Sequence, residues 1–339
     1  MAALKGKGTG QKSAALKGAK KAPMPRVLKP QLATLVKAAP VGGNWLAEIK
    51  FDGYRMLLNL GSGKVRILSR SGRDWTEKFP NIARAAARLR VKNAWIDGEA
   101  VVLDARGRSH FQLMQNAMAH PARSHFVYYA FDLPYLDGQD LRRVPLHQRK
   151  RRLETLLAGV GDPLLYSGHI EGQVADVLET ACKAGLEGVV AKAADSVYTE
   201  ERTKTWLKVK CVRRQEMVVG GYSEPGGSRI AFGALFLGVY QPDGRLRYSG
   251  KVGTGFNEAS LQAVYRKLKP LETTRPAFAN PPKGAEARGA HWVKPELVAE
   301  IAFTEWTDEG TLRHPSFQGL REDKKARDVV RETPAELGA

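Results

Sequence analysis

The 339-residue chain is long enough for two domains of ordinary size, and 43% hydrophobic and 26% charged residues are typical of a globular protein. Its formal net charge of +19, from 54 Lys+Arg against 35 Asp+Glu, favours a polyanionic partner, usually nucleic acid, over a basic protein selected for solubility. No apolar run reaches the ~18 residues of a membrane helix and no signal peptide is visible, which indicates a cytoplasmic protein with no membrane partner.

The two cysteines, Cys182 and Cys211, lie far apart in the sequence. They lack metal-ligand spacing, which argues against a zinc site and predicts buried free thiols.

The first stretch, residues 1–24, is basic and rich in small residues. Residues 1–22 contain six lysines and no acid, which predicts a disordered tail. Such a tail either holds DNA through its phosphates or is a solvated extension. From residue 25 to 40 the chain approaches the first domain through turns and one short apolar segment.

Residues 48–55 read Glu-Ile-Lys-Phe-Asp-Gly-Tyr-Arg. A strand here puts Glu48 and Lys50 on one face. Gly53 then lets the chain turn close to a ligand, and Arg55 offers a planar donor fork suited to phosphate or ribose. A potential amine nucleophile, Lys50, therefore lies beside a carboxylate, a turn and an anion receptor. For the octapeptide alone, the alternative is a surface ion pair.

The strand is expected to continue to residue 60, turn as a hairpin at residues 61–63, and return through residues 65–68 to a loop with Arg70. Helices are expected at residues 81–90, 145–157 and 172–184.

The predicted strand at residues 95–103 carries two acids in an apolar run. Burying an acid is costly unless it is paired or bound to a metal. A turn would explain Asp97 before Gly98, but not Glu99 before a purely apolar run. A further strand at residues 126–133 contains Phe131, which by itself is typical of a core residue.

Two later strands also carry charged residues. In residues 186–192, Glu187 is a candidate ligand for a hard cation and Lys192 a candidate phosphate contact. In residues 206–210, alternation puts Lys208 and Lys210 on one strand face, which as a charge run alone would be a solvated face.

Near residues 211–214 the sequence changes to short strand-like runs separated by tight turns, which predicts a domain boundary. Beyond it, short strands with tight Pro/Gly turns predict a small β-barrel, with a helix near residues 258–268 and a late strand at 298–306. Residues 321–324 read Arg-Glu-Asp-Lys.

Taken together, these segments resemble six motifs, in the right order over residues 25–330, of the covalent nucleotidyltransferases: ATP-dependent DNA ligases, RNA ligases and mRNA capping enzymes. Lys50-x-Asp52-Gly53-x-Arg55 resembles their nucleophile motif. The fuller string most resembles the ligase module of bacterial non-homologous end-joining ligases of the ligase D type.

The resemblance implies an α+β fold, in which a nucleotidyltransferase (adenylation) domain of antiparallel sheets with helices is followed by a C-terminal OB-fold β-barrel. The expected division is a disordered basic tail over residues 1–24, the adenylation domain over 25–211, the OB-fold domain over 212–332 and a C-terminal tail over 333–339.

The resemblance also implies the roles of individual residues. Lys50 is the expected catalytic nucleophile on ATP, the AMP donor, and Phe131 is expected to stack on the purine. The expected nucleotide-binding residues are Glu48, Ile49, Arg55, Arg70, Glu99, Phe131, Lys192, Lys208 and Lys210. The expected leaving-group motif is Arg321, Asp323 and Lys324, and the expected ligands of a Mg²⁺ or Mn²⁺ ion are Glu99 and Glu187.

The implied activity is sealing of breaks in duplex DNA by three transfers: AMP to Lys50, AMP to a DNA 5′-phosphate, and displacement of AMP by a 3′-hydroxyl. A free lysine has a pKa of about 10.4, so nearby cations must favour its neutral form. The implied partners are DNA nicks or ends, Ku, and end-joining polymerase or nuclease modules. A monomer acting at the nucleoid is expected.

Two other functions remain open at this point. Within enzymes, the alternative is an RNA ligase or an mRNA-capping guanylyltransferase. From another class, it is a non-catalytic OB-fold DNA-binding protein, which has no need of carboxylates such as Glu99 and Glu187. The chain has no Gly-rich loop ending in Gly-Lys-Ser/Thr, which argues against an ordinary P-loop ATPase.

Overall fold

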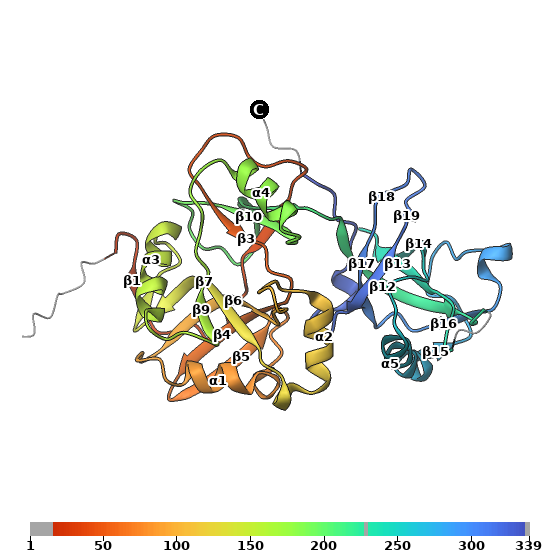
Figure 1. Cartoon of the computed structure of the whole chain (residues 1–339), viewed down its shortest axis with the longest axis horizontal. Coiled ribbons are helices and arrows are strands. Elements are labelled where there is room, and N and C mark those ends of the chain that lie inside the picture. The colour runs from red at the N-terminus through yellow and green to blue at the C-terminus, as the bar shows by residue number, and fades with distance from the viewer. Residues whose placement is uncertain (1–15, 227–229, 336–339) are drawn as a thin grey trace, which may run out of the picture.

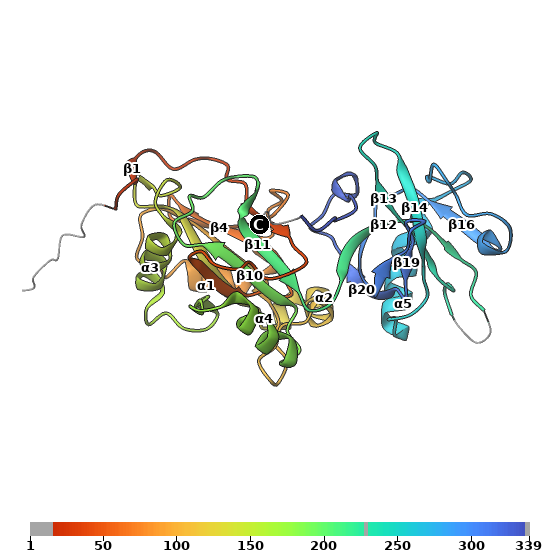
Figure 2. The same cartoon turned by 90° about the horizontal axis from the view of Figure 1, so that it is seen from above.

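The computed structural model describes residues 16–226 and 230–335, which form two lobes side by side (Figures 1 and 2). The first lobe contains the strands up to Lys210, and the second begins with the strand at Arg214. Most of the predicted basic tail, residues 1–15, lies outside the described residues, as do residues 336–339. Within the described part of the chain, no helix is long and apolar enough to cross a membrane.

The larger sheet of the first lobe has the strand order β1-β8-β7-β6-β4-β5, with β9 beside β7. The predicted hairpin turn joins β4 to β5 through Ser62 and Gly63, which have positive φ values of 52° and 71°. The strands are β1 (Lys20–Lys21), β4 (Tyr54–Gly61), β5 (Lys64–Ser69), β6 (Ala94–Val101), β7 (Val127–Leu136), β8 (Gln139–Asp140) and β9 (Leu164–Tyr166).

The smaller sheet of the first lobe has the order β2-β11-β10-β3, formed by β2 (Leu32–Leu35), β3 (Trp45–Ile49), β10 (Gly188–Ala193) and β11 (Arg202–Lys210). Residues 50–53 connect β3 of this sheet to β4 of the larger one, so the predicted nucleophile lies where the chain passes between sheets. The sheets are mainly antiparallel, as predicted, but β2 pairs with β11, and β9 with β7, in parallel.

Helices cover these sheets: α3 packs on β7 and β9, α4 on β10 and β3, and α1 near β5 and β9. The helix α2, in a segment for which no element was predicted, lies on the side that faces the second lobe (Figure 1). The predicted helix over 81–90 was too long, because α1 ends at Ala86 and a turn follows. The bounds are α1 (Pro80–Ala86), α2 (Phe111–Ala119), α3 (Leu146–Leu157), α4 (Val174–Lys183), η1 (Thr76–Lys78) and η2 (Pro121–Arg123).

The second lobe has an OB-fold-type sheet with the order β14-β13-β12-β16-β15, and β17 pairs with β12 and β20. The expected barrel is not closed among the described residues, since the short β15 pairs with β16 and leaves β14 at an edge. The elements are β12 (Arg214–Ser223), β13 (Leu235–Tyr240), β14 (Leu246–Val252), α5 (Glu258–Leu268), η3 (Lys269–Leu271), β15 (Glu272–Thr273), η4 (Gly284–Ala287), β16 (Ala290–Val293), β17 (Val298–Ala302), β18 (Glu305–Trp306), β19 (Leu312–Arg313), β20 (Ser316–Leu320) and η5 (Ala326–Asp328).

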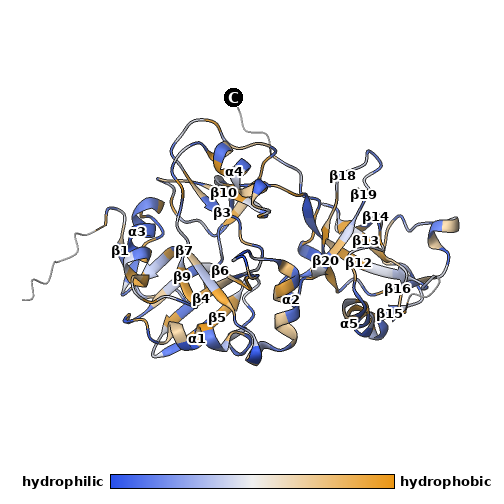
Figure 3. Ribbon diagram, viewed as in Figure 1, coloured by the Kyte–Doolittle hydropathy of each residue, from blue (hydrophilic) through white to orange (hydrophobic). Residues whose placement is uncertain are grey.

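Hydrophobic residues concentrate along the strands of both lobes (Figure 3). The buried apolar clusters follow the two lobes: one contains residues from Met217 to Val329, and the others contain residues from Leu28 to Val209. Each lobe therefore has its own core.

Two expectations about the chain outside the motifs were wrong. Cys182 and Cys211 are joined in a disulfide, because the end of α4 and the end of β11 bring their Cα atoms to 5.3 Å. Part of the predicted disordered tail is ordered, since β1 pairs with β8 and Leu16 packs against the core.

Candidate active site

A cleft between the lobes brings together nearly all of the predicted site residues. Asp323 is the exception: it borders a smaller neighbouring hollow. The predicted residues that line the cleft are Glu48, Ile49, Lys50, Arg55, Arg70, Glu99, Phe131, Glu187, Lys192, Lys208, Lys210, Arg321 and Lys324.

Lys50 follows β3 directly and is held by the end of β10. Its backbone N–H donates to the Gly188 carbonyl at 3.0 Å, and its Nζ lies 2.5 Å from Glu187 Oε2. The register of the two strands, with Ile49 opposite Val189, sets this pair. Gly188 is required here because it has a φ of +151° and a Cβ would meet the Val209 carbonyl at 2.1 Å. The local backbone thus aims the amine into the cleft beside a carboxylate.

Arg55 is fixed by Asp97, a residue that the sequence analysis attributed to a turn. Arg55 Nε and Nη2 donate to the two Asp97 oxygens at 2.6 and 2.7 Å, and the Tyr198 hydroxyl donates to the same carboxylate at 2.6 Å. Asp97 is fully buried within the continuous strand β6. Burial alone would lower the pKa of Arg55, but Asp97 raises it above its ordinary value. The guanidinium lies 4.5 Å from the Phe131 ring centroid.

Glu48 is the buried acceptor for two lysines. Lys150 Nζ donates to one of its oxygens at 2.7 Å and Lys192 Nζ to the other at 2.8 Å. Lys192 also lies 4.1 Å from the Phe131 ring centroid and 4.2 Å from that of Trp206. Burial lowers the pKa of Lys192 to about 8, although Glu48 acts in the opposite direction. Lys150 was not predicted as a site residue. It lies on α3, which has several basic residues, and their spacing does not indicate which of them is buried.

Lys208 and Lys210 lie on one face of β11, as alternation predicted, while Val209 between them is buried in the core. Lys208 Nζ is 2.7 Å from Glu332 Oε1, and Lys210 Nζ is 3.6 Å from Glu332 Oε2. Burial lowers the pKa of Lys208 to about 8, and Glu332 opposes this shift. Glu332 was not predicted as a site residue.

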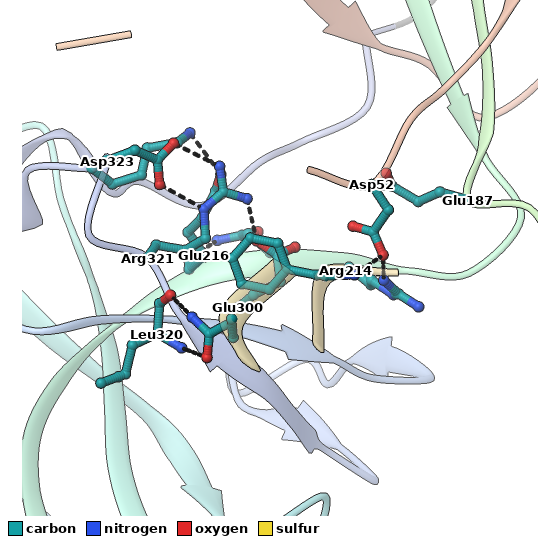
Figure 4. Close-up of polar contacts among 12 residues, drawn as sticks. Asp52, Glu187, Arg214, Glu216, Glu300, Leu320, Arg321 and Asp323 are labelled. Carbon is teal, nitrogen blue, oxygen red and sulfur yellow. Dashed lines mark hydrogen bonds and ion pairs between the residues drawn. The ribbon is translucent and has the colours of Figure 1, made fainter. Parts of the chain in front are cut away.

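The second lobe contributes a network of ions at the seam (Figure 4). Arg321 binds both oxygens of Asp323, at 2.9 and 2.8 Å, and its Nη1 lies 3.3 Å from Glu300. Lys324 pairs with Glu216 at 2.6 Å. Arg321 also lies 4.8 Å from the ring centroid of Phe111 in the first lobe. In this arrangement the second lobe reaches the cleft.

Two further contacts join the lobes at this seam. Arg214 Nη1 donates to Asp52 Oδ2 at 2.6 Å (Figure 4). The Gln115 side chain on α2 pairs with the backbone of Leu320, accepting from its N–H at 3.0 Å and donating to its carbonyl.

The carboxylates of the cleft fit a hard divalent cation. Burial raises the pKa of Glu99 to about 7, although Arg55 and Lys50 act in the opposite direction, so added positive charge would stabilise its ionised form. Among residues 16–226 and 230–335, no three His, Cys, Asp or Glu side chains form a metal cluster.

Comparisons with known proteins give the family. A model of the ATP dependent DNA ligase domain matches residues 30–210, and one of the ATP dependent DNA ligase C terminal region matches residues 228–324. The chain is 46% identical to the multifunctional non-homologous end joining protein LigD of Pseudomonas aeruginosa, over 93% of this chain and 38% of that protein. It is 41% identical to the LigD DNA repair protein of Mycobacterium tuberculosis, over 90% of this chain and 40% of that protein.

Among solved structures, a mycobacterial DNA ligase D complexed with ATP and MES is 39% identical, with a TM-score of 0.67, covering 90% of this chain and 98% of that one. The fold and the cleft define a nucleotidyltransferase domain followed by an OB-fold-type domain, as predicted. The chain belongs to the ATP-dependent DNA ligase family. It spans only 38% and 40% of the two LigD relatives.

Proposed function

We propose that this chain is an ATP-dependent DNA ligase that forms a lysyl-AMP intermediate on Lys50 and seals breaks in duplex DNA. The observation that carries the proposal is the position of Lys50, 2.5 Å from Glu187 in a cleft also lined by Arg321 and Lys324 of the second lobe. An amine, a neighbouring acid and cations from two lobes are the groups that transfer of a nucleotidyl group requires.

In the first step, the neutral Lys50 amine attacks the α-phosphorus of ATP. An N–P bond forms as the attacking nitrogen releases a proton to water, the bond to the β-phosphate oxygen breaks, and pyrophosphate leaves with the electron pair. Lys208 and Lys210, which line the cleft, would neutralise the α-phosphate oxygens, and Arg321 and Lys324 would bind the leaving pyrophosphate. A DNA 5′-phosphate oxygen then displaces Lys50 from the AMP, and a 3′-hydroxyl finally displaces AMP from the DNA.

Arg55 and Phe131 form one wall of the proposed nucleotide site. The Asp97 and Tyr198 contacts hold the Arg55 fork without any ligand, which supports a preorganised site for ribose or base. Lys192 lies against the Phe131 ring and is held there by Glu48, and the two complete this part of the proposed site.

The metal forms part of the same proposal. Glu99 and Glu187 would hold a Mg²⁺ or Mn²⁺ ion, and the ion would supply positive charge to the reacting phosphates.

The relatives are named as non-homologous end joining proteins, which supports end joining as the process. For the same reason the proposal includes Ku and end-joining polymerase or nuclease modules as partners of the chain. It also includes action at the nucleoid. The core clusters and the two family matches support a domain boundary near residues 211–214. The family matches do not favour an RNA ligase or a capping enzyme.

Incubation with α-labelled ATP and Mg²⁺ or Mn²⁺ tests the proposal. The wild-type chain should become labelled, and Lys50→Ala should not, while its unfolding transition stays unchanged. Lys64→Ala, on the exposed end of β5, is the control and should label normally. Persistent labelling of Lys50→Ala would overturn the assignment, and DNA binding without any labelling of the wild type would favour the non-catalytic binder.

A further inference from the structure

The last described segment, residues 330–335, crosses back from the second lobe to the first. We call it the C-terminal strap. Buried Gln215 holds its start, donating to the Val330 carbonyl at 3.1 Å and accepting from the Glu332 N–H at 2.9 Å. Its other end is held by the first lobe, where the Ala335 N–H donates to the Leu35 carbonyl at 2.9 Å. In Figure 2 the strap runs from the second lobe towards the first.

Glu332 is the charged residue at the centre of the strap. Its side chain and those of Lys208 and Lys210 are each no more than 20% exposed. Burial on its own would raise the pKa of Glu332, but the two lysines lower it to about 2. The carboxylate is therefore ionised at neutral pH. It accepts a hydrogen bond from Lys208 at 2.7 Å and lies 3.6 Å from Lys210, whose Nζ donates to the Arg214 carbonyl at 2.6 Å.

These two lysines line the cleft, whereas Glu332 borders the hollows beside it. A phosphate oxygen and a carboxylate oxygen compete for the same ammonium donors. Basic residues outnumber acidic ones in the lining of the cleft, so the cleft suits a polyphosphate, and a carboxylate held at Lys208 withholds part of that positive charge from it.

We propose that Glu332 is an internal competitor for the α-phosphate of ATP. It is hydrogen-bonded to Lys208 and ion-paired with Lys210 before the nucleotide binds, and ATP must displace it to bind. This inference rests on the proposed function, since it assigns the two lysines to the α-phosphate.

Displacement of Glu332 has a structural consequence. The strap connects the two lobes, so losing its central ion pairs loosens one of the ties between them. Nucleotide binding to Lys208 and Lys210 is thereby coupled to release of the strap from the first lobe.

The first test measures self-adenylylation against ATP concentration, together with calorimetric binding of ATP in the Lys50→Ala background. Glu332→Gln should lower both the KM and the Kd for ATP by about tenfold, which corresponds to ~1.4 kcal/mol, with little change in kcat. The control Glu305→Gln removes an exposed carboxylate paired with Arg313 in the same lobe and should change neither constant.

A second variant separates displacement of the strap from the effect of removing the negative charge of Glu332. Gln215→Met leaves every charge in place but removes the two hydrogen bonds that hold the strap. It should lower the KM for ATP in the same direction, by a smaller factor than Glu332→Gln. Trypsin cleavage after Arg331, whose guanidinium lies 4.5 Å from the Trp306 ring centroid, should become faster when ATP saturates the Lys50→Ala protein.

Opposite results would overturn the inference. Weaker or unchanged ATP binding in Glu332→Gln would mean that Glu332 positions the lysines or does nothing, and unchanged cleavage after Arg331 would mean that the strap stays bound. A wild-type chain that binds ATP but forms no AMP adduct would instead overturn the proposed function, so the two failures are distinguishable.

Discussion

The charged residues of the first lobe and those of the seam between the lobes are stabilised in different ways. In the first lobe, the important pairs are buried and have both partners in the same lobe, as Arg55 with Asp97 and Arg149 with the equally buried Asp132 do. At the seam, besides the pairs within the second lobe, some partners come from opposite lobes: Asp52 binds Arg214, and Lys78 binds Glu322 at 3.2 Å with both side chains well exposed.

The apolar residues show the same difference. None of the hydrophobic clusters among the described residues combines residues before position 210 with residues after position 216. A polar interface without a shared core can open at low cost, because water replaces its hydrogen bonds and ion pairs. The wall of the proposed nucleotide site is therefore held in place by buried pairs before a ligand binds, whereas the contacts of the second lobe can form and break during a reaction cycle.

The largest expected effect is on a buried pair of the first lobe. Asp97→Asn keeps the side-chain shape but leaves the Arg55 charge without its counter-ion, so the free energy of unfolding should fall by about 3–5 kcal/mol. Urea unfolding is the measurement. The control is Asp243→Asn, which breaks an exposed pair with Arg245 and should cost under about 0.5 kcal/mol. A small loss for Asp97→Asn would show that the wall is not held by this pair.

A second prediction concerns the step in which the seam acts. Arg321 and Lys324 face a pyrophosphate only in the first transfer, so Lys324→Ala or Arg321→Ala should slow self-adenylylation by about 100-fold, or ~3 kcal/mol. Sealing of a nick that already carries AMP should be affected far less. Single-turnover kinetics of both steps on one variant measure this. Lys324→Ala is the cleaner change, since Arg321→Ala also removes the partner of buried Asp323.

Equal losses in the two steps would contradict this role. They would indicate that Arg321 and Lys324 support the fold or bind DNA. The contacts of the seam would then not be specific to the first transfer.

A third prediction uses pH. The pKa of Glu99 is raised from its usual value to about 7 by burial, so the folded state favours the protonated acid. Its contribution to stability is complete below the unfolded pKa and is lost as the pH rises through about 7. Glu99→Gln imitates the protonated form, so without nucleotide or metal it should be more stable than the wild type at pH 8, by about 1–2 kcal/mol, and similar at pH 5.

Urea unfolding at the two pH values measures this difference, and the well-exposed Glu171→Gln is the control. The same Glu99→Gln protein should lose metal-dependent adenylylation, because an amide is a poorer ligand than a carboxylate for a hard cation. A variant that is no more stable at pH 8 would show that Glu99 is not strained by burial in the empty cleft.

The sequence was informative where a functional residue interrupts a local pattern. Lys208 and Lys210 alternate with buried residues, and Glu99 breaks an apolar strand, so both features were recognisable before any partner was known. The family and the two-part fold could be predicted from such motifs in order, and the comparisons confirm them. The roles of the individual residues stay predictions.

The residues that sequence reasoning missed act through distant partners. Tyr198 reaches Asp97 across 101 positions, Lys150 reaches Glu48 across 102, and Glu332 reaches Lys208 across 124. Pairing over such distances depends on strand register and on how the lobes meet, which period-2 or helical spacing does not encode. The disulfide was missed for the same reason, because Cys182 and Cys211 meet only when α4 packs on the sheet of β11.

The smallest expected effect concerns the contact between Gln115 and Leu320. It resembles backbone pairing, and Gly319 leaves room for it, since a Cβ there would lie 2.4 Å from Gln115 Oε1. Because water can replace these hydrogen bonds once the lobes separate, Gln115→Ala should cost under about 1 kcal/mol in unfolding, but slow self-adenylylation by about fivefold. Small-angle scattering should show a larger radius of gyration for the variant, whereas Gln112→Ala, which removes only a contact with Asn116 on the same helix, should change neither. If Gln115→Ala lowered stability as much as Asp97→Asn does, the seam would be part of the permanent fold and the second lobe would have to act without leaving the first.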